Sequence, residues 1–124
     1  MADAPVLKIK LQIMRGDEIA MGPGKADLLD AIAADGSISA GARAIGMSYR
    51  RAWLLVDTMN RCWQAPLVET APGGKARSGA QVTALGREVL AQYRALQAAA
   101  DGLRGGEWER LRGLLAGASR NESG

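Results

Sequence analysis

Residues that could bind a polyanion gather near the middle of the chain. A serine, a tyrosine and two arginines follow one another in the segment SYRRAW: Ser48, Tyr49, Arg50 and Arg51. Arginine can pair with the O6/N7 edge of guanine or with a phosphate, and serine, tyrosine and a helix N-terminus can hold a phosphate. A second basic pair, Lys75 and Arg77, lies in the glycine-rich segment APGGKARSG. Both clusters are candidate contacts to a nucleic acid.

Composition argues against enzymatic and metal-binding functions. The chain has no histidine and one cysteine, Cys62, so the commonest metal ligand and the usual proton-transfer side chain are missing. Carboxylate pairs such as Asp17 and Glu18 have no nucleophile or base beside them, and we expect them to be solvated. The glycine-rich segment is not a phosphate loop, because Glu69 replaces a required glycine and Ala76 a required serine or threonine. We therefore expect no catalytic site, cofactor or metal.

The 124 residues are expected to form a cytoplasmic protein. Hydrophobic residues make up 48% and charged residues 23% of the chain, as in globular proteins, and the formal net charge of +3 permits an acidic partner. The early apolar segment PVLKIKLQIM is interrupted by lysines, so it suits neither a signal peptide nor a membrane span. A single cysteine fits a reducing compartment.

Apolar periodicity and breaker residues predict a mainly α fold with a small β component, in the order of a winged helix-turn-helix. The expected elements are a strand at 6–14, a turn at 15–18, a loop at 20–25, a helix at 25–34, a short helix at 40–45, a helix from Ser48 to Cys62 or Trp63, hairpin strands at 67–70 and 80–83, a long helix at 84–102, and an amphipathic segment before a tail.

The short helix at 40–45 and the helix that follows it form the expected helix-turn-helix. Ser37 or Ser39 is expected to cap the first, Gly46 to make the turn and Ser48 to cap the second. In such a motif the first residues of the second helix enter the DNA major groove. The residues expected in the core on this helix are Ala52, Trp53, Leu55, Val56 and Met59, and Tyr49 could either pack or contact DNA.

Two segments resemble a known family. LLDAIAADGSISAGARAIGMSYRRAWLLVDTMN and the following PLVETAPGGKARSGAQVTALGREVLAQYRAL are similar to the N-terminal DNA-binding domain of ModE, the bacterial molybdate-responsive transcriptional regulators, a domain related to the winged helix of LysR-type regulators. The resemblance covers about residues 6–100. It implies a homodimer that binds a palindromic operator and usually represses genes for molybdate uptake.

The resemblance also implies roles for individual residues. The expected DNA-binding residues are Ser39, Arg43, Ser48, Tyr49, Arg50 and Arg51 on the helix-turn-helix, with Gly73, Gly74, Lys75, Arg77 and Ser78 on the wing. The expected dimer elements are the N-terminal strand and a long C-terminal dimerisation helix, with dimerisation residues Leu85, Val89, Tyr93 and Leu96. Of these, Leu85, Val89 and Leu96 are expected to form an exposed stripe. Such a stripe would be unfavourable on a monomer. We expect a DNA-binding and dimerisation domain at 1–102, and a short helix with a flexible tail at 103–124.

The resemblance does not extend to the whole family architecture. Full-length members carry C-terminal β-barrel domains that bind molybdate, and no segment after Gly102 resembles them. We therefore expect double-stranded DNA and a second copy of the chain as partners, without direct binding of molybdate. We expect Trp108 and the leucines after it to pack on the long helix. An alternative stays open: a winged-helix module that binds a protein partner through its long helix and has little DNA affinity.

Overall fold

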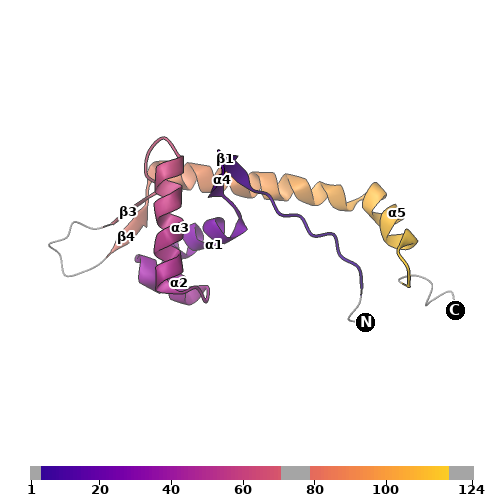
Figure 1. Ribbon diagram of the computed structural model, residues 1–124, viewed down its shortest axis with the longest axis horizontal. Helices are drawn as coiled ribbons and strands as arrows, with labels where there is room; N and C mark the ends of the chain where they lie inside the picture. The colour runs from indigo at the N-terminus through magenta and orange to yellow at the C-terminus, as the bar shows by residue number, and fades with distance from the viewer. Residues whose placement is uncertain (1–3, 71–78, 118–124) are drawn as a thin grey trace. The chain divides into compact units, whose positions relative to one another are not determined.

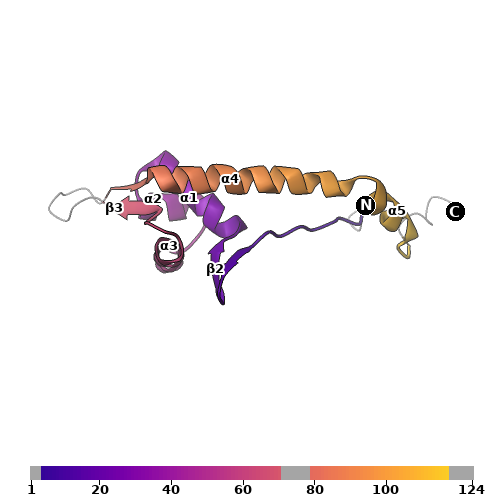
Figure 2. The same cartoon turned by 90° about the horizontal axis from the view of Figure 1, so that it is seen from above.

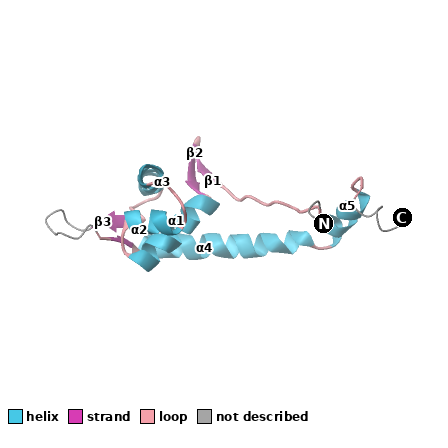
Figure 3. Ribbon diagram, turned by 90° about the horizontal axis from the view of Figure 1, so that it is seen from below, coloured by secondary structure: helices cyan, strands magenta, loops and turns pink. Residues whose placement is uncertain are grey.

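The computed structural model describes residues 4–70 and 79–117, which form a mainly α structure with two small antiparallel hairpins (Figures 1 and 3). The expected wing loop at 71–78 and the tail at 118–124 lie outside the described residues. The chain divides into two compact units, one of Lys10–Arg94 and one of Met1–Ile9 with Ala95–Gly124. Among the helices described, none is long and apolar enough to cross a membrane.

The larger unit has the element order of a winged helix-turn-helix, which confirms the predicted fold class. Its elements are β1 (Ile13–Arg15), β2 (Glu18–Met21), α1 (Pro23–Asp35), α2 (Ile38–Ala44), α3 (Tyr49–Cys62), β3 (Val68–Thr70), β4 (Ala80–Val82) and most of α4 (Ala84–Ala100). Helices α1, α2 and α3 pack on one another, and β3 and β4 pair in register to form the base of the wing. Helix α3, seen end-on in Figure 2, is the second helix of the motif.

Local capping residues set the ends of the three helices. Gly36 ends α1 with a φ of 79°, in the left-handed region that glycine tolerates, and its N–H donates to the carbonyl of Ile32. The Ser37 hydroxyl accepts from the Ala40 N–H at 3.0 Å, so Ser37 rather than Ser39 is the cap and α2 starts two residues earlier than predicted. Gly46, with a φ of 71°, makes the expected turn before α3.

A close approach of backbones holds α2 against α1. A Cβ atom added at Gly41 would lie 3.0 Å from the Ile32 nitrogen and 3.1 Å from the Ala31 carbonyl carbon. Any larger residue would therefore push the two helices apart. The small-residue composition of the short helix predicts this close crossing, and the packing confirms it.

The core lies between the three helices, the base of the wing and α4. The largest side chains buried almost completely are Met21, Leu28, Leu29, Ile32, Met59, Leu67 and Tyr93. The Tyr93 hydroxyl donates to the Leu11 carbonyl at 2.8 Å, which joins α4 to the segment before β1. Arg94 ties α4 to α1 through Asp27 at 2.9 Å and Asp30 at 2.6 Å.

The N-terminal strand is shorter than predicted. The alternation is confirmed, because Leu7, Ile9 and Leu11 are half-buried while Lys8 and Lys10 are exposed. Only Ile13–Arg15 is a strand, however, paired with β2. A strand needs a neighbour for its backbone hydrogen bonds. In the part of the chain that the structure describes, β2 pairs only with Ile13–Arg15, so residues 4–12 have no regular secondary structure.

The expected loop at 20–25 is wrong. Residues Glu18–Met21 form β2, and α1 already begins at Pro23. Proline fits the first position of a helix, because its missing N–H would have no helical partner there. Gly22 and Pro23 therefore mark the start of a helix. The long helix α4 ends at Ala100, and a 3₁₀ turn, η1 (Asp101–Arg104), follows where the prediction continued the helix to Gly102.

The smaller unit has no buried residue among those described. It contains the last turns of α4, η1 and α5 (Gly106–Leu114). Arg104 joins Asp101 and donates to the Leu7 carbonyl at 3.0 Å. The expected packing of the α5 leucines is wrong, since Leu111 and Leu114 are 59% and 62% exposed.

Gly86 allows α4 to start directly against the wing. A Cβ there would fall on the carbonyl oxygen of Leu67 and 2.7 Å from Cγ1 of Val82. We expect Gly86→Ala to lower the free energy of unfolding by about 1–3 kcal/mol, because backbone atoms must move. Urea denaturation followed by circular dichroism measures this. Gly24→Ala is the control, because nothing lies within 4 Å of its added Cβ; an equal loss in both variants would contradict the packing argument.

Candidate nucleic-acid interface

The first turn of α3 is an exposed, capped helix end with basic side chains. The Ser48 hydroxyl accepts from the Arg51 N–H at 3.1 Å, as predicted for the cap. Ser48, Tyr49, Arg50 and Arg51 are all exposed, so their polar groups are accessible to a ligand. The positive end of the helix dipole adds to the charge of the two guanidinium groups. This end of α3 can bind a phosphate or the edge of a base.

Helix α3 is amphipathic, and its inner side joins the core. Ala52, Val56, Met59 and Cys62 are buried, while Leu55 is half-buried. Trp53 does not belong to this side: it is 39% exposed, and its predicted place in the core is wrong. Consecutive residues on a helix are about 100° apart, which turns Trp53 away from the buried Ala52.

The two residues expected to assist from α2 are placed differently. Arg43 is exposed in the last turn of α2, and Ser39 is half-buried in its first turn. Arg43 lies three residues before the Gly46 turn, on the stretch of chain that leads into α3. The structure thus leaves the Arg43 guanidinium accessible, and the Ser39 hydroxyl less so.

The base of the wing is described, and its tip is not. Strands β3 and β4 pair antiparallel, with Val68 opposite Val82 and Thr70 opposite Ala80. This confirms the predicted hairpin. The five wing residues expected to bind DNA lie outside the described residues: Gly73, Gly74, Lys75, Arg77 and Ser78. Their contact with DNA stays a prediction.

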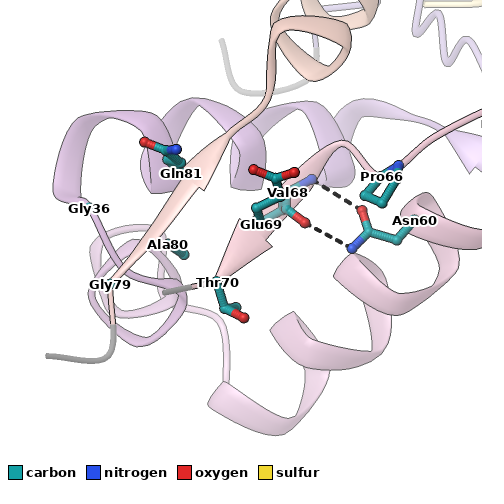
Figure 4. Close-up of a pocket in the computed structure, with 9 residues that line it drawn as sticks. All are labelled: Gly36, Asn60, Pro66, Val68, Glu69, Thr70, Gly79, Ala80 and Gln81. Atoms are coloured by element: carbon teal, nitrogen blue, oxygen red, sulfur yellow. Dashed lines mark hydrogen bonds between the residues drawn. The ribbon is translucent and has the colours of Figure 1, made fainter. Parts of the chain in front are cut away.

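Asn60 joins α3 to the wing. Its amide oxygen accepts from the Leu67 N–H at 2.8 Å. The same oxygen accepts from the Val68 N–H at 3.1 Å, and the amide nitrogen donates to the Val68 carbonyl at 3.0 Å (Figure 4). One side chain thereby satisfies three backbone groups of the adjoining strand. A short polar residue near a helix end gives no sequence signal for this role, so the sequence did not predict it.

An ion-pair network fixes the C-terminal end of α3. Arg61 donates to both oxygens of Glu18 at 2.9 and 3.0 Å and to Asp57 at 3.1 Å. These hydrogen bonds, first that to Asp57, raise the pKa of Arg61. The Trp63 indole N–H donates to the Ala20 carbonyl at 2.9 Å, a second link to β2. Glu18 was expected to be simply solvated, and it is instead paired across 43 residues of sequence.

Burial shifts the pKa of two groups near α3, the Cys62 thiol and the Lys25 amine. Burial, then the Glu18 carboxylate, raises the pKa of the Cys62 thiol, so the thiolate is disfavoured at neutral pH. Burial lowers the pKa of Lys25, and the nearby charge of Arg51 lowers it further. Within 4–70 and 79–117 there is no group of three His, Cys, Asp or Glu residues that could hold a metal ion.

A hollow of about 850 Å³ lies between the end of α1, α3 and the wing (Figure 4). Its lining residues are Gly36, Asn60, Pro66, Val68, Glu69, Thr70, Gly79, Ala80 and Gln81. Glu69 is the ionisable group among them, and the Asn60 amide is already engaged by the backbone of β3. This lining offers no nucleophile paired with a base, so it does not make a candidate active site.

The residues predicted for dimerisation do not form one exposed surface. Val89 and Tyr93 are 8% and 1% exposed and belong to the core of their own chain. Leu85 is half-buried against the same core. The stripe prediction was wrong in this respect, because α4 turns that side towards α1 and the wing. Leu96, in the smaller unit, is 52% exposed.

Comparison with known proteins gives three informative relatives. No family model matches the chain. The DNA-binding transcriptional dual regulator ModE of Escherichia coli K12 is 38% identical over 119 residues, 93% of this chain and 44% of the relative. The molybdenum-pterin-binding protein MopB of Rhodobacter capsulatus is 49% identical over 78 residues, 63% of this chain and 29% of the relative. The molybdenum transport protein ModE of Azotobacter vinelandii is 44% identical over 70 residues, 56% of this chain and 26% of the relative.

The chain is a homologue of the ModE regulators. This agrees with the resemblance to the N-terminal domain of that family. The ModE-like chain spans less than half the length of each relative named above. The relatives' names describe a DNA-binding transcriptional regulator, a molybdenum-pterin-binding protein and a molybdenum transport protein.

The amide of Asn60 should stabilise the wing against α3. We expect Asn60→Ala to lower the free energy of unfolding by about 1–3 kcal/mol, because three partly buried backbone groups lose their partner. Chemical denaturation measures the loss. Asn60→Asp is the matched control: it keeps an oxygen for the Leu67 and Val68 N–H groups but removes the donor, so a smaller loss is expected. A loss in Asn60→Asp as large as in Asn60→Ala would show that these two accepted bonds contribute little.

Proposed function

We propose that the protein is a sequence-specific DNA-binding regulator of molybdenum-related genes that binds a palindromic operator as a homodimer. The observation that carries the proposal is the exposed first turn of α3, where a serine cap and two arginines stand at the start of the second helix of the motif. The homology to ModE regulators supports DNA binding, and the names of the relatives support the link to molybdenum.

In the proposed complex, α3 enters the major groove from its N-terminal end. Arg50 can then form two hydrogen bonds to a guanine, while Arg51 and the Ser48 end of the helix hold phosphates. Lys75 and Arg77 of the wing would neutralise neighbouring phosphates. The ion pair of Arg61 with Glu18 links the far end of α3 to β2.

The homodimer part of the proposal is supported by the smaller unit. Several leucines there are exposed: Leu96, Leu103, Leu111, Leu114 and Leu115. A unit with this much exposed apolar surface and no buried residue among those described is expected to be covered by another chain. A second copy would give two α3 helices, and hence two symmetric half-sites one or more helical turns apart.

We expect the α3 contacts and the wing contacts to affect DNA binding differently. Arg50→Ala should lose about 1–3 kcal/mol of discrimination at one base pair, because a pair of hydrogen bonds to guanine is removed. Lys75→Ala should weaken all sequences alike and lower the salt slope by about one, because one phosphate contact is lost. Fluorescence anisotropy at several salt concentrations, on selected and scrambled duplexes, measures both. Equal effects of the two changes on specificity would contradict this division.

Leu96→Glu should dissociate the dimer, since it places a charge in the proposed apolar contact. Sedimentation velocity should show a shift to monomer at micromolar concentration, and operator affinity should fall while the circular dichroism spectrum stays unchanged. Glu88→Gln on the same helix is the control, as an exposed site in the larger unit. A wild-type chain that is monomeric on its operator would contradict the dimer without contradicting DNA binding.

The alternative function, a module for a protein partner, keeps one supporting observation: the exposed leucines of α5. It predicts DNA binding at the non-specific level, unaffected by Arg50→Ala. Duplexes from beside the gene and beside molybdate-transport genes, titrated with and without molybdate, distinguish the two. Salt-sensitive binding to one duplex supports the regulator, and an effect of molybdate would show that this chain senses it directly.

A further inference from the structure

The outward side of α3 carries an apolar patch that neither the core nor the basic contacts explain. Tyr49 and Trp53 are 55% and 39% exposed, and they lie one turn apart on the same side of the helix. Adjacent large side chains left in water are one mark of a binding surface. We call these two residues the aromatic patch.

The two rings of the patch are already arranged without a ligand. The Tyr49 and Trp53 ring centroids are 6.2 Å apart and their planes are 81° apart, an edge-to-face contact. Such contacts are favourable, and the two rings restrict each other's rotamers. A surface ordered in advance loses less entropy when it binds. The patch is therefore suited to a ligand with fixed, small apolar features.

The charges around the patch indicate what that ligand is. Arg50 and Arg51 directly follow Tyr49 in the first turn of α3, so the patch begins beside the basic end of the helix. At its other end Asp57 is paired with Arg61 at 3.1 Å, which offsets its charge. Tyr49 to Asp57 spans about 12 Å at 1.5 Å per residue, close to the width of the major groove. The patch is thus continuous with the proposed DNA interface.

Duplex DNA offers one kind of apolar group in that groove. Its bases are stacked, so an aromatic ring cannot lie on their faces without unstacking them, and only their edges are accessible. Among these edges the thymine C5-methyl group is the apolar one, and it is absent from the other three bases. An apolar patch carried into the groove on α3 can therefore distinguish thymine by contact.

We propose that the aromatic patch reads thymine methyl groups in the major groove, with Trp53 as the specificity-determining residue. The inference rests on the proposed DNA binding and adds to it a second mode of reading, apolar where that of Arg50 is polar. Trp53 contacts a methyl group, and Tyr49 holds the Trp53 ring through the edge-to-face contact. The half-site then contains thymine next to the base pair read by Arg50.

The experiment compares thymine with uracil in the same duplex. The wild-type chain first selects its preferred duplex from a random pool. Deoxyuridine then replaces thymidine at one position at a time, which removes a methyl group and keeps the base pair. Binding of each duplex to wild type and to Trp53→Ala is measured by anisotropy. At one or two positions we expect uracil to weaken the wild type about fourfold, the value for losing one buried methyl group.

The variant should lose this response. Trp53→Ala should bind the thymine duplex more weakly than wild type does, and it should bind the thymine and uracil duplexes equally. Arg50→Ala is the matched control: it should bind more weakly but keep the fourfold response to uracil. Thermal unfolding of each variant verifies its fold, and Trp53→Leu, which keeps an apolar side chain, should retain part of the response.

The outcomes separate the two proposals. If no duplex is selected above non-specific binding, the proposed function fails, and the thymine inference fails with it. If a duplex is selected but uracil weakens wild type and Trp53→Ala alike, the protein binds DNA and the inference alone is overturned. Binding to single-stranded DNA that depends on Trp53 and exceeds duplex binding would also overturn it, because the ring would then stack on bases.

Discussion

The helix-turn-helix depends on how closely α2 can approach α1. At Gly41 the backbone of one helix lies against the backbone of the other, and an added Cβ atom would be only 3.0 Å from the Ile32 nitrogen. This contact sets the crossing of α2 over α1, and the Gly46 turn then directs α3 away from it. With α2 placed, α3 can bury Ala52, Val56 and Met59 while its first turn stays in solvent. The placing of α3, with its two exposed arginines, thus depends in part on a glycine in the preceding helix.

The two ends of α3 have opposite electrostatic roles. At its C-terminal end, Arg61 is neutralised by Glu18 and Asp57, and Trp63 is bonded to β2, so this end is anchored. At the N-terminal end, the side-chain hydrogen bond described is the cap, in which the Ser48 hydroxyl accepts from the Arg51 N–H. Hydrogen bonds and ion pairs thus accumulate at one end of the helix and leave the charges of the other available to a ligand.

Sequence reasoning predicted most of what depends on local signals. Serine caps, turn glycines and apolar periodicity act within a few residues, so Ser48, Gly46 and the hairpin strands were placed correctly. Roles that depend on partners far along the chain could not be predicted from the sequence. Asn60 and Glu18 acquire their roles from β3 and α3, and the direction of Trp53 follows from which side of α3 meets the core. The wing residues and the dimer stay predictions.

The placement of Trp63 and its two fellow tryptophans gives the molecule built-in optical probes. Trp63 is half-buried against the core and hydrogen-bonded to Ala20, Trp53 is partly in solvent on the outward side of α3, and Trp108 is half-buried in α5. An indole's emission depends on the polarity around it, so the three environments differ in colour and in access to quenchers. Chains that keep one tryptophan each would report separately on the fold, on α3 and on the C-terminal helix, without any attached dye.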